Sequence, residues 1–138
     1  MTNKEVVTGF FKALDNNDLA TAKKLLGPNH HIYSSMSPEP ANAEQHIAIH
    51  TMFTEGFSNG VHEWADILED GNKVVARGIW SGSHTGTFNG IAPTNKNGHL
   101  PFITICEIEN NEIKHQWVEM DSMSLMMQLG AMPEPAHG

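Results

Sequence analysis

Residues 100–121, LPFITICEIENNEIKHQWVEMD, determine the fold class. Two runs of β-favouring residues alternate apolar and polar side chains on either side of Asn110-Asn111, a typical turn sequence. The stretch therefore predicts a β-hairpin with strands over 100–109 and 112–121. Towards the N-terminus, residues 61–69 and 73–83 repeat the alternation around Asp70-Gly71-Asn72, which predicts a second hairpin. Residues 84–88 can extend its second strand past a glycine bend.

The first 60 residues have a helical period instead. Apolar side chains at helical spacing predict helices over about 3–15, 19–26 and 43–57, and a closing helix over 122–129. Residues 30–35 favour a short strand, and Ser37-Pro38-Glu39-Pro40 a loop. Helices followed by antiparallel strands are typical of an α+β fold. We expect a curved antiparallel sheet of roughly four to six strands wrapped around the N-terminal helices as a cone with one pocket.

Composition narrows the function classes. The 138 residues contain 8 Lys and Arg against 16 Asp and Glu, a net charge of −8, which argues against nucleic acid or an anionic membrane surface as a partner. The single cysteine, Cys106, excludes an internal disulfide framework and a multi-thiolate metal site. No signal peptide or membrane-spanning run is evident. We expect one cytoplasmic domain over residues 1–132, followed by a C-terminal tail over 133–138.

The strand predicted over 112–121 is the most informative segment for chemistry. Alternation places Ile113, His115, Trp117, Glu119 and Asp121 on one face. If this face looks into the cone, it supplies an aromatic wall and proton-transfer groups; otherwise it is the solvated face. From the parity that it shares with Ile113, we predict that Trp117 is buried and faces the inside of the cone.

Asp121 has two interpretations that do not exclude each other. It immediately precedes the closing helix, so its side chain can be the N-cap of that helix. A carboxylate held in an apolar pocket also has a raised pKa that suits general acid/base catalysis. The sequence leaves both interpretations open.

Histidines are unusually frequent. His46 and His50 lie four residues apart on the third predicted helix, the spacing of a zinc pair, but no third ligand can be assigned. We therefore predict pocket-lining histidines and no metal. His84 lies in a glycine-rich strand. A single histidine in such a position more often makes structural hydrogen bonds than acts as a base. The side chains expected to bind the substrate are Tyr33, His50, Phe53, His115 and Trp117.

Residues 74–94, VVARGIWSGSHTGTFNGIAPT, resemble the SnoaL-like polyketide cyclases. The recurrent order in that family is an Arg- and Trp-containing strand, Gly-Thr-His-x-Gly, and Gly-Ile-x-Pro-Thr-Gly. The end of the chain is similar as well. Ile113, Trp117 and Asp121, followed by Gln128-Leu129-Gly130, look like the family's Ile-x-x-x-Trp-x-x-x-Asp and Gln-Leu-Gly. The resemblance covers essentially the whole chain.

This resemblance implies a cone-shaped, nuclear-transport-factor-like fold that is usually oligomeric, so we expect a homodimer or homotetramer. Characterised cyclases of the family close a ring by intramolecular aldol condensation of a polyketide ester, without metal or cofactor. By the resemblance, Asp121 is the acid/base and His84 lines the same pocket. The chain departs from the family at Glu107, where Arg is frequent, at Asn95, where Gly is frequent, and at Thr104, where the cyclases have a pocket histidine.

Three functions follow as hypotheses. The first is a cofactor-independent enzyme that removes a proton α to a carbonyl group of a small hydrophobic substrate, with Asp121 and His84 as catalytic residues. The second is a non-catalytic binding protein that uses the same pocket. The third is an epoxide hydrolase, which needs an Asp–Arg–Asp array; Arg77 and Asp121 are present, but the sequence places no second aspartate beside them.

Overall fold

The computed structural model describes residues 1–132, so the tail expected over 133–138 lies outside the described residues. Three of the helices precede the long strands in the sequence. In order, the elements are α1 (Asn3–Asp15), α2 (Leu19–Leu26), β1 (His31–Ser34), β2 (Ser37–Ala41), α3 (Ala43–Gly56), β3 (Phe57–Asp70), β4 (Lys73–His84), β5 (Asn97–Glu109), β6 (Glu112–Met120) and α4 (Ser122–Gln128).

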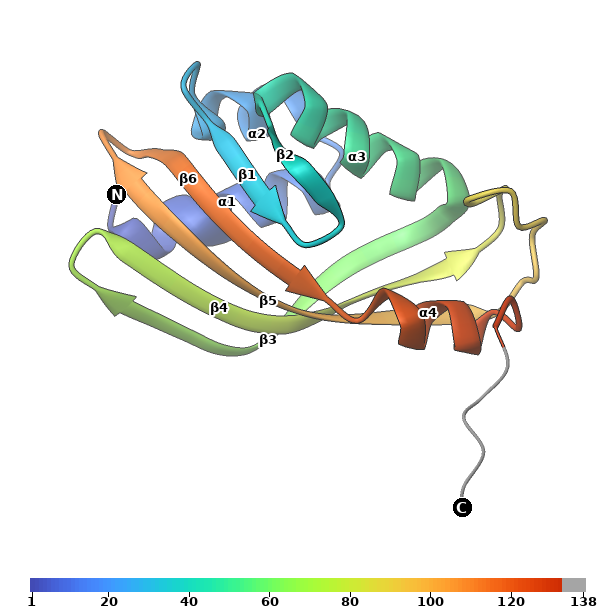
Figure 1. The fold of residues 1–138 in the computed structure, drawn as a ribbon. Helices are drawn as coiled ribbons and strands as arrows, with labels where there is room; N and C mark the ends of the chain where they lie inside the picture. Colours follow the sequence, from blue (N-terminus) through green and yellow to red (C-terminus); the bar gives the residue numbers. More distant parts are fainter. Residues whose placement is uncertain (133–138) are drawn as a thin grey trace.

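The strands form one curved sheet in the order β2-β1-β6-β5-β4-β3, and α1, α2 and α3 lie over its concave side (Figure 1). The predicted α+β fold with a sheet curved around the N-terminal helices is confirmed. One pairing differs from the expected antiparallel sheet. Because β1 runs parallel to β6, the sheet is mixed.

Ser37–Ala41 is a strand rather than the predicted loop. It pairs antiparallel with β1 at the edge of the sheet, where Ala41 lies opposite Ile32. Pro38 and Pro40 lack the N–H group that a central strand needs, but an edge strand bonds on one side only and tolerates them. The two prolines therefore indicated an edge strand, not the absence of a strand.

Side-chain capping fixes where α1 and α3 begin. A capping box begins α1: Glu5 N–H donates to Thr2 Oγ1 at 3.1 Å, and Thr2 N–H donates to Glu5 Oε1 at 3.0 Å. Asn42 and Gln45 form an equivalent box at the start of α3. These bonds satisfy backbone donors that have no partner inside the helix.

Two apolar clusters form the core. The first packs α1 and α2 against the sheet, and its most buried large side chains are Val6, Val7, Phe10, Leu26, Val74 and Ile113. The second joins the other ends of the strands to α4, and it contains Phe57, Trp80, Phe88, Leu100, Phe102, Leu125 and Leu129. Together the two clusters hold α3 over the concave face of the sheet.

A β-bulge in β6 decides which side chains face inward. Ile108 pairs with Ile113, whereas the preceding residue, Glu107, pairs with His115, so Lys114 is an extra residue in β6. A bulge of this kind reverses the alternation of the side chains that follow it. Ile113 is fully buried, but Trp117 is 39% exposed on the outer face. The prediction that Trp117 is buried inside the cone is wrong for this reason.

Candidate functional site

A cavity of about 700 Å³ lies between α3 and the concave face of the sheet. Its wall is mainly apolar, with Ile49 and Phe53 from α3, Trp80 from β4, and Leu100 and Phe102 from β5. The volume falls within the usual range for small-molecule sites, roughly 300–1,000 Å³. The pocket predicted inside the cone is therefore present, and it is open to solvent on one side.

Polar side chains interrupt this wall at a few points. His46 and His50 come from α3, His62 from β3, and Gln116 from β6. Two atoms among them, His50 Nε2 and Gln116 Oε1, are buried and have no hydrogen-bond partner within residues 1–132. A buried polar atom without a partner costs about 1–3 kcal/mol. Both atoms have almost no accessible surface, so they lie behind the surface of the wall rather than on it.

His46 is held by a second histidine behind the cavity wall. His30 Nδ1 lies 2.6 Å from the Ile113 carbonyl oxygen, so this nitrogen carries the proton, and His30 Nε2 accepts from His46 Nδ1 at 2.9 Å. Burial lowers the pKa of His30 to about 4 and that of His46 to about 3. Both imidazoles are therefore neutral near neutral pH.

His62 is held by a carboxylate at the end of α1. Its Nδ1 donates to Asp15 Oδ1 at 2.6 Å, and its backbone N–H donates to Asp15 Oδ2 at 2.9 Å. His50 interacts electrostatically with both His62 and Asp15. Burial is the main cause that lowers the pKa of His50, and His62 lowers it further while Asp15 opposes the change.

Of the predicted substrate-binding residues, the structure brings His50 and Phe53 to the cavity. Phe53 packs edge-on against Trp80, with ring centroids 5.3 Å apart, so both rings form one part of the wall. The i, i+4 spacing of His46 and His50 correctly predicted two histidines that line the cavity.

The other three lie on the outer face of the sheet. Tyr33 stacks on Trp117 at 5.6 Å between ring centroids, and His115 lies 6.0 Å from Trp117. Lys73 Nζ lies 5.9 Å above the indole ring. Tyr33 joins this group because β1 pairs with β6 in register opposite Trp117. None of the three lines the cavity, which corrects the sequence-based expectation.

His84 is fully buried but does not line the cavity, contrary to the expectation from the resemblance. Its Nδ1 lies 2.9 Å from Thr94 Oγ1 and accepts the Thr94 backbone N–H at 3.2 Å. The ring packs on Phe57. These contacts fasten the loop between β4 and β5, which agrees with the alternative that His84 is hydrogen-bonded structure.

Asp121 is the N-cap of α4, as the cap interpretation predicts. Its Oδ1 accepts the Ser124 backbone N–H at 3.0 Å, and the residue is exposed. Its chain neighbours Met120 and Ser122 both line the cavity. Asp121 therefore lies at the edge of the cavity rather than on its wall.

Arg77 lies on the outer face of the sheet. Its Nε and Nη2 donate to Asp66 Oδ2 at 2.8 and 2.6 Å, and both side chains are more than half exposed. The cavity wall, as far as the structure describes it, contains no arginine. The Asp–Arg–Asp array that an epoxide hydrolase needs is not assembled there.

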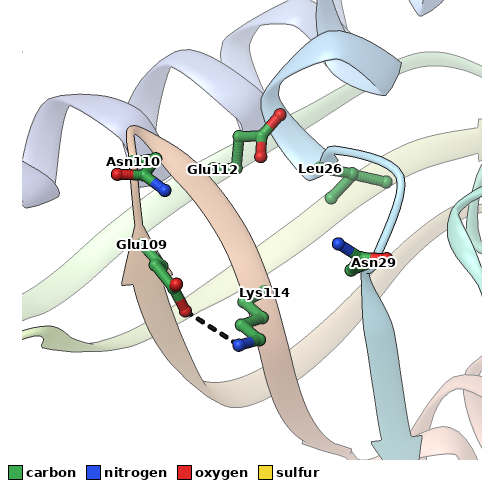
Figure 2. A pocket seen from close by; sticks show the side chains of 6 residues that line it. All are labelled: Leu26, Asn29, Glu109, Asn110, Glu112 and Lys114. Atoms are coloured by element: carbon green, nitrogen blue, oxygen red, sulfur yellow. Dashed lines mark hydrogen bonds and ion pairs between the residues drawn. The ribbon is translucent and has the colours of Figure 1, made fainter.

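A smaller cleft of about 80 Å³ lies at the turn between β5 and β6 (Figure 2). Lys114 Nζ and Glu109 Oε2 form an ion pair of 2.9 Å across it. Their hydrogen bond raises the pKa of Lys114 and lowers that of Glu109. Both side chains are exposed, so the pair is an ordinary surface ion pair of small energetic effect.

Within residues 1–132, no three His, Cys, Asp or Glu side chains are grouped so that they could hold a metal ion. None of the helices in this range is long and apolar enough to cross a membrane.

Sequence reasoning missed His62, Asp15 and Gln116. Asp15 and His62 are 47 residues apart, and no local motif joins them. Uninterrupted alternation would place Gln116 on the face opposite the predicted site. The extra residue Lys114, which the sequence pattern does not indicate, reverses this placement. Gln116 could be identified only by knowing which alternate residues of β6 face inward after the bulge.

Several solved structures share the fold. IdmH from Streptomyces antibioticus, described as a candidate polyketide cyclase, matches with a TM-score of 0.85 and 21% identity, over 94% of this chain and 99% of that one. AclR from Streptomyces galilaeus, described as a candidate hydroxylase, matches with a TM-score of 0.88 and 18% identity, over 97% and 84%. TsrD from Streptomyces laurentii matches with a TM-score of 0.81 and 24% identity, over 94% and 95%.

These likenesses show the fold alone, and one fold can support different chemistries. No curated protein matches the chain in sequence. The family model of the SnoaL-like polyketide cyclases matches residues 4–129, which include every helix but the first residue of α1, all six strands and the Gln128-Leu129 ending. The chain therefore belongs to the SnoaL-like polyketide cyclase family.

Proposed function

We propose that this protein is a cofactor-independent enzyme of the polyketide cyclase type that acts on a hydrophobic compound with carbonyl groups. The cavity carries this proposal: its wall is mainly apolar, and the polar side chains of His46, His50, His62 and Gln116 interrupt it at a few points. A purely hydrocarbon ligand would make no use of these polar side chains. A polycyclic or extended ketone supplies the apolar surface together with oxygen atoms that bind such groups.

The proposed reaction is an intramolecular aldol ring closure. A base removes a proton from the carbon α to one carbonyl, and the electron pair becomes an enolate. The enolate carbon then forms a bond to a second carbonyl carbon of the same molecule, whose oxygen becomes an alkoxide and takes up a proton. The step needs no oxidant or reductant, and an acid/base of the protein can transfer both protons.

The family resemblance proposes Asp121 for this acid/base role. In support, Asp121 lies between two residues that line the cavity, and its cap uses only Oδ1. Against it, the residue is exposed rather than enclosed by the apolar wall. The role of Asp121 is therefore the first point to test.

The test is the exchange of α-protons of 2-tetralone, a bicyclic ketone, for deuterium in D₂O, followed by ¹H NMR. Proton abstraction alone produces exchange, so the natural ring-forming substrate is not needed. We expect the wild-type protein to accelerate the exchange and Asp121→Asn to reduce it by about 10²–10⁴-fold if Asp121 is the base.

Asp121→Ala provides the matched control. Asn is itself a good N-cap, whereas Ala removes the bond to Ser124 and costs about 1 kcal/mol of stability. If Asn keeps wild-type exchange and only Ala is impaired, in proportion to a lower melting temperature, Asp121 is a helix cap alone. The acid/base of the proposed enzyme is then another side chain of the cavity.

A non-catalytic binding protein is the second candidate, because the carboxylate expected to react is exposed and engaged in a cap. The same experiment separates the two functions. If 2-tetralone binds, as shown by a change in the fluorescence of Trp80 on the cavity wall, and no exchange is accelerated, the binding protein is favoured.

A further inference from the structure

Asp15 at the end of α1 and His62 on β3 form a hydrogen-bonded pair, and His62 lines the cavity. The two side chains are 18% and 11% exposed, and Nδ1 of His62 lies 2.6 Å from Asp15 Oδ1. Asp15 Oδ2 accepts the backbone N–H of His62 at 2.9 Å, so both carboxylate oxygens hold the same residue. This double contact fixes the direction of the imidazole ring and the nitrogen that carries its proton.

Aromatic side chains hold the His62 ring from several sides. Trp64 lies nearly parallel to it at 6.1 Å, Phe102 meets it edge-on at 5.7 Å, and Phe11 lies 4.8 Å away. Phe11 and Phe102 also line the cavity. The ring is therefore fixed in orientation within an apolar surround, as a preorganised proton-transfer group must be.

The second nitrogen of His62 is available. Since Asp15 can only accept, Nδ1 carries the proton of the neutral ring, and Nε2 is the unprotonated nitrogen. Nε2 has no protein partner within the described chain and is not among its buried unpartnered atoms, so it retains accessible surface. Because His62 lines the cavity, a ligand there can approach this nitrogen.

We propose that His62 is the general base of the cavity and that Asp15 is its positioning residue. This inference rests on the proposed function, because it assigns the proton-transfer step of that reaction. His62 Nε2 takes the proton from the carbon α to the substrate carbonyl, and the electron pair of the broken C–H bond forms the enolate. The imidazolium returns the proton to the alkoxide after ring closure.

Asp15 gives this step an electrostatic advantage. Proton uptake turns the neutral His62 ring into a cation directly beside the Asp15 carboxylate, in a site largely shielded from water, where opposite charges attract strongly. His50 on α3 also interacts electrostatically with the pair, and burial lowers its pKa. His50 is therefore neutral near neutral pH and does not oppose the new charge.

The pair also ties α1 to β3, so a purely structural role must be separated from catalysis. We use the exchange of 2-tetralone α-protons in D₂O with His62→Gln, Asp15→Asn and the wild-type protein. His99→Gln is the matched control, because His99 is exposed and bonds to Ser81 rather than lining the cavity. Melting temperatures and binding of 2-tetralone, measured by tryptophan fluorescence, accompany each rate.

We expect His62→Gln to bind the ketone and to lose about 10²–10⁴-fold in exchange rate, while His99→Gln keeps the wild-type rate. Asp15→Asn should lose about tenfold or more, because the amide keeps the shape but not the charge. If His62→Gln binds the ketone and keeps its exchange rate, the inference is overturned and the proposed enzyme function stands. If the wild-type protein fails to bind the ketone, or binds it without accelerating exchange, both are overturned.

A readout independent of activity uses the ¹⁵N NMR signals of the histidine rings in the full chain. The neutral His62 ring should carry its proton on Nδ1, and Asp15→Asn should shift this ring towards the Nε2–H tautomer. Addition of 2-tetralone should then move the Nε2 signal of wild-type His62. A ring with its proton on Nε2 in the wild-type protein would overturn the assignment even if Asp15→Asn destabilises the fold.

Discussion

Ile113 and Trp117 are four residues apart on β6, yet their side chains lie on opposite faces of the sheet. In an uninterrupted strand they would share one face. The extra residue Lys114 reverses the alternation, so Ile113 packs in the core while Trp117 stacks on Tyr33 outside. The same reversal brings Gln116 to the cavity wall. One bulge thus decides which alternate side chains of β6 line the cavity.

The position of Trp117 predicts its response to an aqueous quencher. Iodide should quench the fluorescence of Trp117, which is 39% exposed, and should hardly reach Trp80, which is 5% exposed. A Trp117→Phe variant should therefore lose most of the accessible fluorescence. Wild-type emission that iodide cannot reach would contradict the outward orientation of Trp117.

The buried histidine pair predicts that stability falls in mild acid. His30 has a pKa of about 4 in the folded protein and an ordinary value of 6.5, so between these values the unfolded chain binds a proton that the folded chain does not. The free energy of unfolding should therefore decrease as the pH falls from about 6.5 to about 4, by about 3 kcal/mol for His30 alone.

Urea unfolding at several pH values measures this effect. His46, whose folded pKa of about 3 has the same cause, contributes in the same direction. His46→Gln should be less stable near neutral pH but should depend less on pH, whereas His99→Gln should follow the wild-type curve. A wild-type stability that is constant between about pH 6.5 and 4 would contradict the neutral pair.

The position of Gln116 predicts that its replacement raises stability and weakens ligand binding. Its Oε1 is buried without a partner, and its Nε2 donates to Thr104 Oγ1 at 3.0 Å. Gln116→Met removes the unsatisfied oxygen and keeps the volume, so the free energy of unfolding should rise by about 1 kcal/mol. The variant should bind a hydroxylated ketone more weakly than the wild-type protein does. Equal binding would show that Gln116 does not face the ligand.

The outer face of the sheet predicts a homodimer, one of the two assemblies expected from the family resemblance. An apolar row crosses five strands in register: Tyr33 lies opposite Trp117, Trp117 opposite Ile105, Ile105 opposite Val75, and Val75 opposite Leu68. Neighbouring positions carry both charge signs, with Glu107 opposite Lys73 and Asp66 opposite Arg77. A second copy related by a two-fold axis can match both features.

Sedimentation or light scattering tests this assembly. Ile105→Lys places a charge in the middle of the row and should convert the dimer to a monomer. Met123→Lys is the control, because Met123 is an exposed apolar residue on α4, away from the row. A wild-type protein that is monomeric at all accessible concentrations would contradict the predicted homodimer.

The sequence by itself determined the α+β class and most of the elements, but not the edge strand β2. Period-two alternation and the Asn110-Asn111 turn specify the β5–β6 hairpin, and Thr2 and Glu5 specify the start of α1. The i, i+4 spacing of His46 and His50 placed both histidines on the cavity side of α3. These features depend on residues that are close in the chain, so local patterns are sufficient to predict them.

Only the tertiary structure decided the composition of the site. Asp15 and His62 meet because α1 packs on β3, and His30 meets His46 because the chain before β1 packs against α3. The bulge at Lys114 arises from the pairing of β6 with β5, and it sent His115 and Trp117 outward. Such contacts depend on how distant elements pack and register, and the order of residues in one segment does not contain that information.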